Sequence, residues 1–143
     1  MSRHAVIIDT NAIVAGLLTR NDASPDFVKS ARILDGMLAA AFPFVVSGAL
    51  LAEYRAVLVR PGLRKLHGLT VAEVETLLTD IAQHAIVLAP VATSPAPDPG
   101  DQRLWELLAA KSDLLLITGD KLLLRDAGMQ GRIVSPQAFV ARA

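Results

Sequence analysis

Short apolar runs alternate with helical segments along the chain, and this alternation is the feature that most restricts its fold. The first run, Val6-Ile7-Ile8, precedes a short helical stretch, and residues 26–41 then carry apolar positions at spacings of four, three and four, as on one face of a helix. The predicted strands cover residues 6–8, 44–46, 85–88, 114–117 and 132–134. The predicted helices cover residues 12–18, 26–41, 49–59, 70–84 and 101–111, with two more starting near Lys121 and at Pro136. This order predicts an α/β fold whose mostly parallel sheet is covered by helices on both faces.

Turn and cap signals set the ends of several elements. Thr70, followed by Glu73 three residues later, forms a capping-box pattern and predicts a helix start. The sequence Arg60-Pro61-Gly62 predicts that the preceding helix breaks there. Residues 89–100 contain four prolines, which predicts a loop inside one domain spanning residues 1–143.

The composition excludes several kinds of protein. Fourteen basic and fourteen acidic residues cancel, so nucleic-acid binding would have to come from a local patch or through bound metal. The chain has no cysteine, which excludes disulfides and thiolate metal sites. A hydrophobic content of 52% fits either an additional subunit or partner interface or simply a core rich in alanine and leucine.

No segment predicts a membrane anchor. The longest uncharged stretch, residues 36–52, contains Pro43, Ser47 and Gly48 and is shorter than the roughly 20 apolar residues that a spanning helix needs. The first residues, MSRHAVIID, show no apolar segment with a cleavage site after it. We therefore expect a cytoplasmic protein without membrane association.

Two acidic residues follow predicted strands directly. Asp9 ends the first strand, and Asp120 lies in Thr118-Gly119-Asp120 after the fourth. Each could be an ordinary helix cap or turn residue, and Asn11 competes with Asp9 for that role. Ligands of parallel α/β sheets gather at the carboxyl ends of the strands, however, so both residues are also candidates for a binding site.

Asp98 and Asp101 open the helix that leads into the fourth strand. The sequence Asp98-Pro99-Gly100-Asp101 has the pattern of an ordinary helix start. Asp101 lies three and seven residues before Leu104 and Leu108, so it shares the face that this helix buries. A buried carboxylate without a partner is costly, and a bound metal would remove that cost.

Glu53 lies inside a predicted helix, where capping cannot explain it. At about 100° per residue it falls at the edge of the apolar stripe that includes Leu50 and Tyr54. The alternative is a surface ion pair with Arg55 or Arg60. Neither interpretation is excluded by the pattern of this helix.

The arrangement of all these acids along the chain indicates a shared site more strongly than any one of them does. Acids that follow neighbouring parallel strands, or line adjoining helices, can converge on one edge of the sheet. Packed carboxylates repel one another and raise each other's pKa. Hard divalent cations such as Mg²⁺ or Mn²⁺ relieve this repulsion through oxygen ligands. Such a site suits hydrolysis of phosphoesters.

Four stretches, in this order and spacing, resemble the PIN-domain family: Val6 to Leu18, Glu53-Tyr54-x-x-Val57-Leu58-x-Arg60-Pro61, Asp98-Pro99-x-Asp101 and Thr118-Gly119-Asp120-Lys121. The resemblance extends from about Ala5 to Phe139. Within this family, the chain is similar in type to the PIN proteins that are toxins of bacterial toxin–antitoxin pairs, the VapC-type ribonucleases. It implies a three-layer α/β/α fold with a central, mostly parallel sheet of four to five strands. It also implies a Mg²⁺- or Mn²⁺-dependent ribonuclease site.

The resemblance further implies which side chains form that site. The acidic quartet that binds metal and performs catalysis is matched by Asp9, Glu53, Asp101 and Asp120, and a further acid by Asp98. Small polar residues that hydrogen-bond the acids or metal-bound water are matched by Thr10, Asn11, Ser47 and Thr118. In the expected reaction a metal-activated water attacks an RNA phosphorus in line, which leaves 5′-phosphate and 3′-hydroxyl ends. An RNA substrate, a cognate antitoxin and a homodimer are the expected partners.

One position departs from the family pattern. Many relatives carry an acid after Gly-Asp-Lys, where this chain has Leu122, which puts binding of a second metal ion in doubt. Arg60 and Lys121 are the candidates for holding RNA phosphates. His4, His67 and His84 fall in no metal-binding spacing and are expected to be structural or surface residues.

Two other functions remain open. A phosphatase of the haloacid dehalogenase type also begins with a strand ending in Asp, but it requires a second Asp where this chain has Asn11. A covalent phosphate on Asp9 would support that function. A non-catalytic module that binds RNA or a partner protein would fit the neutral charge and apolar composition, and undetectable divalent-metal binding would support it.

Overall fold

The computed structural model describes residues 4–18, 25–126 and 131–142. The elements in chain order are β1 (Val6–Ile8), α1 (Thr10–Leu18), α2 (Pro25–Leu38), β2 (Val45–Val46), α3 (Gly48–Leu58), α4 (Pro61–His67), α5 (Val71–His84), β3 (Ile86–Val87), the 3₁₀ turn η1 (Pro99–Asp101), α6 (Gln102–Leu108), β4 (Leu115–Ile117), α7 (Lys121–Leu124), β5 (Ile133–Val134) and α8 (Pro136–Arg142).

All strand pairs of the described chain are parallel. One sheet has the order β1-β4-β5, and β2 pairs with β3. A parallel bridge between Val6 and Phe44, with a hydrogen bond from the Val6 N–H to the Pro43 carbonyl (3.2 Å), joins the two parts. The resulting order is β3-β2-β1-β4-β5. The chain moves outward from β1 to β3 on one side and then continues on the other side, so β1 and β4 flank the point where the strand order reverses. Ligand sites of such sheets lie at the carboxyl ends of these two strands.

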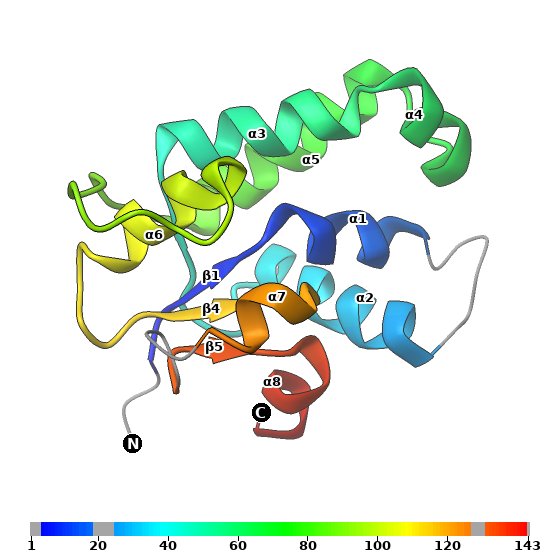
Figure 1. Ribbon diagram of the computed structural model, residues 1–143. Coiled ribbons are helices and arrows are strands. Elements are labelled where there is room, and N and C mark those ends of the chain that lie inside the picture. Colours follow the sequence, from blue (N-terminus) through cyan, green and yellow to red (C-terminus); the bar gives the residue numbers. More distant parts are fainter. Residues whose placement is uncertain (1–3, 19–24, 127–130, 143) are drawn as a thin grey trace.

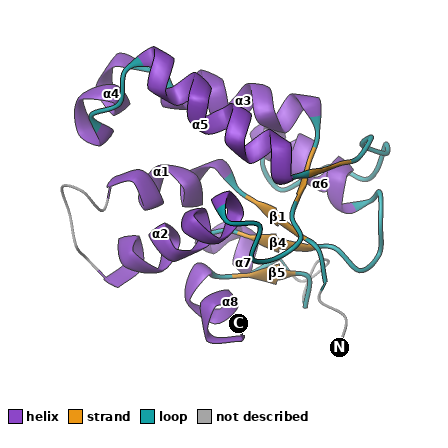
Figure 2. Ribbon diagram, turned by 180° about the vertical axis from the view of Figure 1, so that it is seen from behind, coloured by secondary structure: helices purple, strands orange, loops and turns teal. Residues whose placement is uncertain are grey.

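Helices lie on both sides of the sheet. Figures 1 and 2 show α3 and α5 side by side above the strands and α8 below them, with α1 and α2 running together beyond the carboxyl ends. The central strands are fully buried: Ile7, Leu116 and Ile117 expose none of their surface. Tyr54 of α3 and Met37 of α2 are equally buried against them. The predicted α/β fold with a parallel sheet between helices is therefore confirmed.

The predicted break at residues 60–62 is confirmed, since helix α3 ends at Leu58. Pro61 then opens a further helix, α4, that was not predicted from the sequence. Proline is well accommodated at the first helical position because its missing N–H needs no partner there. Gly68, with φ of 77°, closes α4 in the left-handed region that glycine adopts easily. The predicted helix from residue 101 also begins earlier, as the 3₁₀ turn η1.

Two local predictions are confirmed. Thr70 and Glu73 form the reciprocal capping box at the start of α5. His67 is a buried structural residue, since its Nε2 lies 2.9 Å from the Leu58 carbonyl oxygen and its Nδ1 accepts from the Leu69 N–H. Among the helices of the described residues, none combines the length and the apolar character that crossing a membrane requires.

Candidate functional site

Asp9 and the turn after β4 are tied together at the point where the strand order reverses. The Asp9 N–H donates to the Ile117 carbonyl (2.9 Å) and so extends the pairing of β1 with β4 by one residue. The Thr118 hydroxyl donates to Asp9 Oδ2 (2.7 Å) and accepts from the Asp120 N–H (3.0 Å). Asp9 is only 7% exposed and Thr118 is fully buried. The sheet therefore holds one carboxylate in place through a buried hydroxyl on the neighbouring strand.

Glu53 of α3 lies next to Asp9 through a contact with the neighbouring residue Thr10. The Thr10 hydroxyl donates to its Oε2, and Arg103 of α6 forms an ion pair with its Oε1 at 3.5 Å. The next residue, Tyr54, donates its hydroxyl to the Ile8 carbonyl, which fixes α3 against the end of β1. The alternative partner Arg55 is engaged elsewhere, because it pairs with Glu75 on α5.

Helix capping explains the positions of two of the other three acids but not of the third. Asp98 accepts from the Gly100 N–H (2.8 Å) and starts η1, and Asp120 accepts from the Leu122 N–H (2.9 Å) and starts α7. Capping thus accounts for both. Asp101 precedes α6 without a side-chain cap bond and is half-buried. Its carboxylate is the one in this segment that needs another explanation.

The carboxylates lie close enough to change one another's protonation. The pKa of Asp9 is raised from 3.8 to about 6, chiefly by burial. The negative charges of Asp101 and Glu53 contribute to this rise, and the hydrogen bonds from the Thr118 hydroxyl and the Thr10 N–H oppose it. The pKa of Asp101 is also raised, by burial first and then by the charges of Asp98, Asp120 and Glu53. All five predicted acids therefore belong to one electrostatic cluster, here called the acidic centre: Asp9, Glu53, Asp98, Asp101 and Asp120.

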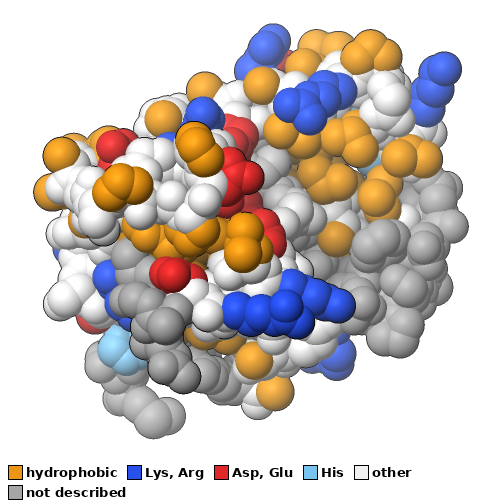
Figure 3. Space-filling view, in the orientation of Figure 1, with side chains coloured by type: hydrophobic (Ala, Val, Ile, Leu, Met, Phe, Trp, Pro, Cys, Tyr) orange, Lys and Arg blue, Asp and Glu red, His pale blue; other side chains and the backbone are white. Residues whose placement is uncertain are grey.

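Figure 3 shows carboxylates gathered in a hollow in the middle of the molecule, with basic side chains beside them over α7. Lys121 and Arg125 are the exposed basic residues of that helix and its end. The face thus combines a strongly negative hollow with a positive border.

The donor set of the acidic centre fits a hard divalent cation. It consists of carboxylate oxygens, with hydroxyls that orient them, and these are the ligands of Mg²⁺ and Mn²⁺. The raised pKa of Asp9 shows a buried negative charge that is incompletely compensated. Within the described ranges, no three His, Cys, Asp or Glu side chains stand together in a preformed metal cage. Both carboxylate oxygens of Glu53 are engaged, one by Thr10 and the other by Arg103.

The smaller predicted residues divide into two groups. Thr10 and Thr118 hydrogen-bond the acids of the centre, as the family resemblance implied. Ser47 does something different: it is buried and accepts from the Leu50 N–H (3.1 Å) as the N-cap of α3. Asn11 is exposed on the first turn of α1 and lines a neighbouring cavity rather than the acidic centre.

The two predicted phosphate-binding residues lie on different elements of the structure. Lys121 is exposed directly after Asp120, beside the acidic centre. Arg60 is exposed at the start of α4. Arg103 was not predicted from the sequence, because its place beside Glu53 depends on how α6 packs against α3. Its position two residues after Asp101 was the available signal.

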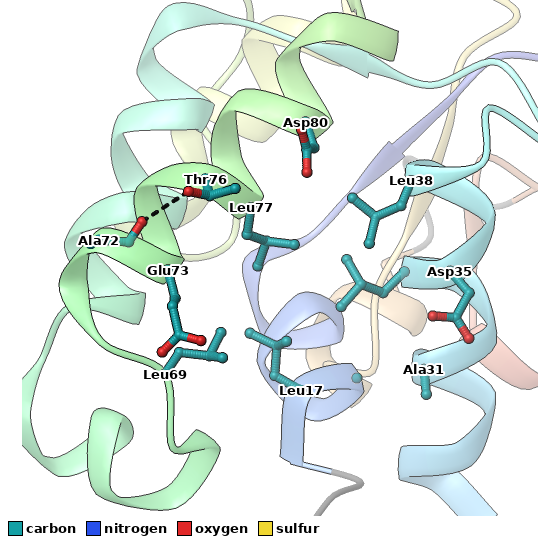
Figure 4. A pocket seen from close by; sticks show the side chains of 12 residues that line it. Leu17, Ala31, Asp35, Leu38, Leu69, Ala72, Glu73, Thr76, Leu77 and Asp80 are labelled. Carbon is teal, nitrogen blue, oxygen red and sulfur yellow. Dashed lines mark hydrogen bonds between the residues drawn. The ribbon is translucent and has the colours of Figure 1, made fainter.

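A separate apolar groove of about 570 Å³ lies between α1, α2 and α5. Figure 4 shows Leu17, Leu38 and Leu77 pointing into it from three different helices. Asp35 and Asp80 stand at its edges, so its rim is acidic. None of the five residues of the acidic centre lines this groove.

Comparison with known families gives one result that bears on this site. A family model described as PIN domain matches residues 5–122, a range that contains the whole acidic centre. A search of curated proteins gives no match.

Proposed function

Because the chain belongs to the PIN-domain family, whose members are generally nucleases that use divalent metal ions, we propose that it is a Mg²⁺- or Mn²⁺-dependent endoribonuclease. The observation that carries this proposal is the buried carboxylate of Asp9 at the β1/β4 strand ends, surrounded by four further acids. Such a charge arrangement is unfavourable for the apoprotein and favourable once a cation is bound.

Asp9, Glu53, Asp101 and Asp120 would hold the metal, with Asp98 at the margin. A bound divalent cation would supply positive charge for the scissile phosphate and lower the pKa of a water nucleophile. The Thr118 hydroxyl keeps the Asp9 carboxylate oriented, and the Thr10 hydroxyl does the same for Glu53. The Asp101 carboxylate, which makes no side-chain cap bond, would be available to accept the proton of the attacking water.

Exposed basic residues would position the RNA at the acidic centre. Lys121, exposed beside Asp120, is close to where a phosphate must lie to be cleaved, and Arg103 stands on the other side, next to Glu53. Both side chains can hydrogen-bond phosphate oxygens. Arg60 would contact the RNA further along, at α4.

The decisive experiment is cleavage of a mixed-sequence single-stranded RNA with Mn²⁺ or with EDTA, by wild type and by Asp9→Asn. Asp80→Asn, which alters an exposed carboxylate on α5, is the matched control. We expect cleavage that needs both metal and Asp9, and products with 5′-phosphate and 3′-hydroxyl ends. Cyclic phosphate ends would contradict attack by water, and unchanged cleavage by Asp9→Asn would refute the assignment of the site.

We also propose that the enzyme is the toxin of a toxin–antitoxin pair and a homodimer. The apolar groove with its acidic rim supports a protein partner, since it suits an amphipathic segment that carries basic residues. Expression of the wild type would then arrest growth while Asp9→Asn would not, and the product of a neighbouring gene would relieve the arrest. Leu77→Lys in the groove would weaken that relief without lowering RNA cleavage. If the arrest also occurs with Asp9→Asn, it does not come from nuclease activity.

A non-catalytic module that binds RNA or a partner is the second candidate, and the groove is the observation that favours it. Calorimetric titration with Mn²⁺ separates the two, because a binding module has no need for a cation at the acidic centre. Metal binding that is lost in Asp9→Asn would exclude this candidate.

A further inference from the structure

A second hollow adjoins the acidic centre, and Lys121, proposed above to contact a phosphate, lies in its wall. Its volume is about 490 Å³, within the range of roughly 300–1,000 Å³ that is typical of small-ligand pockets. Its polar wall is formed by Asn11 of α1, Ser30 of α2, Lys121 of α7, Ser135 and Gln137. We call it the side pocket.

The side pocket and the acidic centre share two turns. After β1, Asp9 and Thr10 face the acidic centre, while the next residue, Asn11, lines the side pocket. After β4, Asp120 belongs to the centre while Lys121 lines the pocket. An RNA strand bound across the carboxyl ends of β1 and β4 would therefore lie against both sites.

The two hollows are opposite in charge. The acidic centre holds five carboxylates, whereas the described residues that line the side pocket include no Asp or Glu, and Lys121 supplies a positive charge. The apolar groove also differs, since Asp35 and Asp80 line it. Of these three hollows, the side pocket is therefore the one suited to an anionic ligand.

Two of the polar residues of the side pocket are held in place by their surroundings. Ser30 is only 3% exposed and lies where α1 and α2 approach closely, since a Cβ on Gly16 would come within 2.9 Å of the Ser30 carbonyl oxygen. Ser135 accepts from the Ala138 N–H (3.1 Å). Between these residues, Leu124 and Pro136 add apolar wall. Hydroxyls and amides next to an apolar surface match the edges and the face of a nucleobase.

We propose that the side pocket binds the base of the nucleotide next to the scissile phosphate of single-stranded RNA, with Gln137 as the residue that selects the base. This inference rests on the proposed ribonuclease function. An amide side chain can donate and accept at one base edge and thereby discriminates between bases. Asn11 contacts the same nucleotide, and Lys121 contacts its phosphate.

The test compares cleavage profiles on a randomised single-stranded RNA for the wild type, Gln137→Ala and the matched control Gln83→Ala, which lies exposed on α5. Sequencing of the product ends gives the base preference at each position beside the cut. We expect a preference at one adjacent position that falls about tenfold in Gln137→Ala and is kept in Gln83→Ala. A second measurement follows the side-chain amide NMR signals of Asn11 and Gln137 in the wild type during titration with the four nucleoside 5′-monophosphates.

The outcomes separate the side pocket from the nuclease function. If RNA is cleaved and Gln137→Ala keeps the base preference, the role of the side pocket is overturned and the nuclease function stands. If no RNA is cleaved but a nucleotide shifts the Gln137 signal, the nucleotide site stands and the nuclease function fails. If there is neither cleavage nor a shift, both proposals are refuted.

Discussion

Replacing Asp9 by Asn should make the protein more stable at pH 8, although it removes the central residue of the proposed active site. The pKa of Asp9 is raised from 3.8 to about 6, chiefly by burial, so the folded protein holds this proton more tightly than the unfolded chain does. Below pH 3.8 the group is protonated in both states and costs nothing. As the pH rises toward 6 only the unfolded chain ionises, and stability is lost progressively; above pH 6 the full cost is present.

The magnitude follows from the size of the pKa change. Each pKa unit corresponds to about 1.4 kcal/mol, so the change from 3.8 to about 6 amounts to about 3 kcal/mol of the free energy of unfolding. The introduced amide would accept weaker hydrogen bonds than the carboxylate, which reduces the gain by about 1 kcal/mol. We therefore expect the free energy of unfolding of Asp9→Asn to exceed that of the wild type by about 2 kcal/mol at pH 8. At pH 4 the difference should be close to zero or reversed.

Urea unfolding in EDTA measures this difference. Trp105 is the single tryptophan and is buried on α6 at 2% exposure, which makes its fluorescence a suitable probe. The pKa of Asp101 is also raised, but Asp101 is present in both proteins. Its contribution to the difference in the free energy of unfolding therefore largely cancels. Adding Mg²⁺ at pH 8 should stabilise the wild type much more than Asp9→Asn, by about 1.4 kcal/mol at ten times the dissociation constant. Equal stability of the two proteins at pH 8, with Asp80→Asn as control, would refute the argument from burial.

Three further variants test other contacts. Thr118→Val removes the hydroxyl bonded to Asp9, and metal affinity in a calorimetric titration should fall about tenfold to a hundredfold; unchanged affinity would mean that the hydroxyl does not orient the carboxylate. Arg103→Ala removes the cation that competes for Glu53, so metal affinity should rise about twofold to threefold. RNA affinity, measured by filter binding, should fall. A loss of metal affinity would contradict this role of Arg103. Gly16→Ala places a Cβ 2.9 Å from a backbone oxygen of α2 and should lower the free energy of unfolding by about 1–3 kcal/mol, which urea unfolding measures.

The parts of the fold and site that could be predicted from the sequence depend on two local features. These are the spacing of apolar residues and the position of polar residues directly after strands. Strand runs and helical stripes are local patterns, and they gave the order of elements around β1 and β4 correctly. The carboxyl-end rule for parallel strands then places Asp9 and Asp120 near each other. Thr118 could be anticipated in the same way, because it is the first residue after β4 and faces the end of β1 through the register of Ile8 with Ile117.

What the sequence could not predict depends on packing between distant elements. Arg103 reaches Glu53 because α6 lies against α3, and no local pattern contains that distance. The ion pair of Arg55 with Glu75 likewise required the packing of α3 on α5. Helix α4 was missed for another reason: Pro61 and Gly62 signal a break as readily as a start, and the choice depends on the buried His67 that anchors the end of that helix.

The separation of charge at the strand ends explains how one small face could carry out two tasks. Five carboxylates on one side attract a cation and repel RNA, and the partial relief that Arg103 gives to Glu53 does not reach Asp9, whose pKa stays raised. A few residues away the wall contains amides, hydroxyls and a lysine, which neither bind a divalent cation well nor repel a phosphate. Since the turns after β1 and β4 contribute residues to both sites, a substrate held by the side pocket would lie next to the acidic centre. In the proposed ribonuclease, a cation would therefore have to neutralise the acidic centre before RNA could lie across both sites.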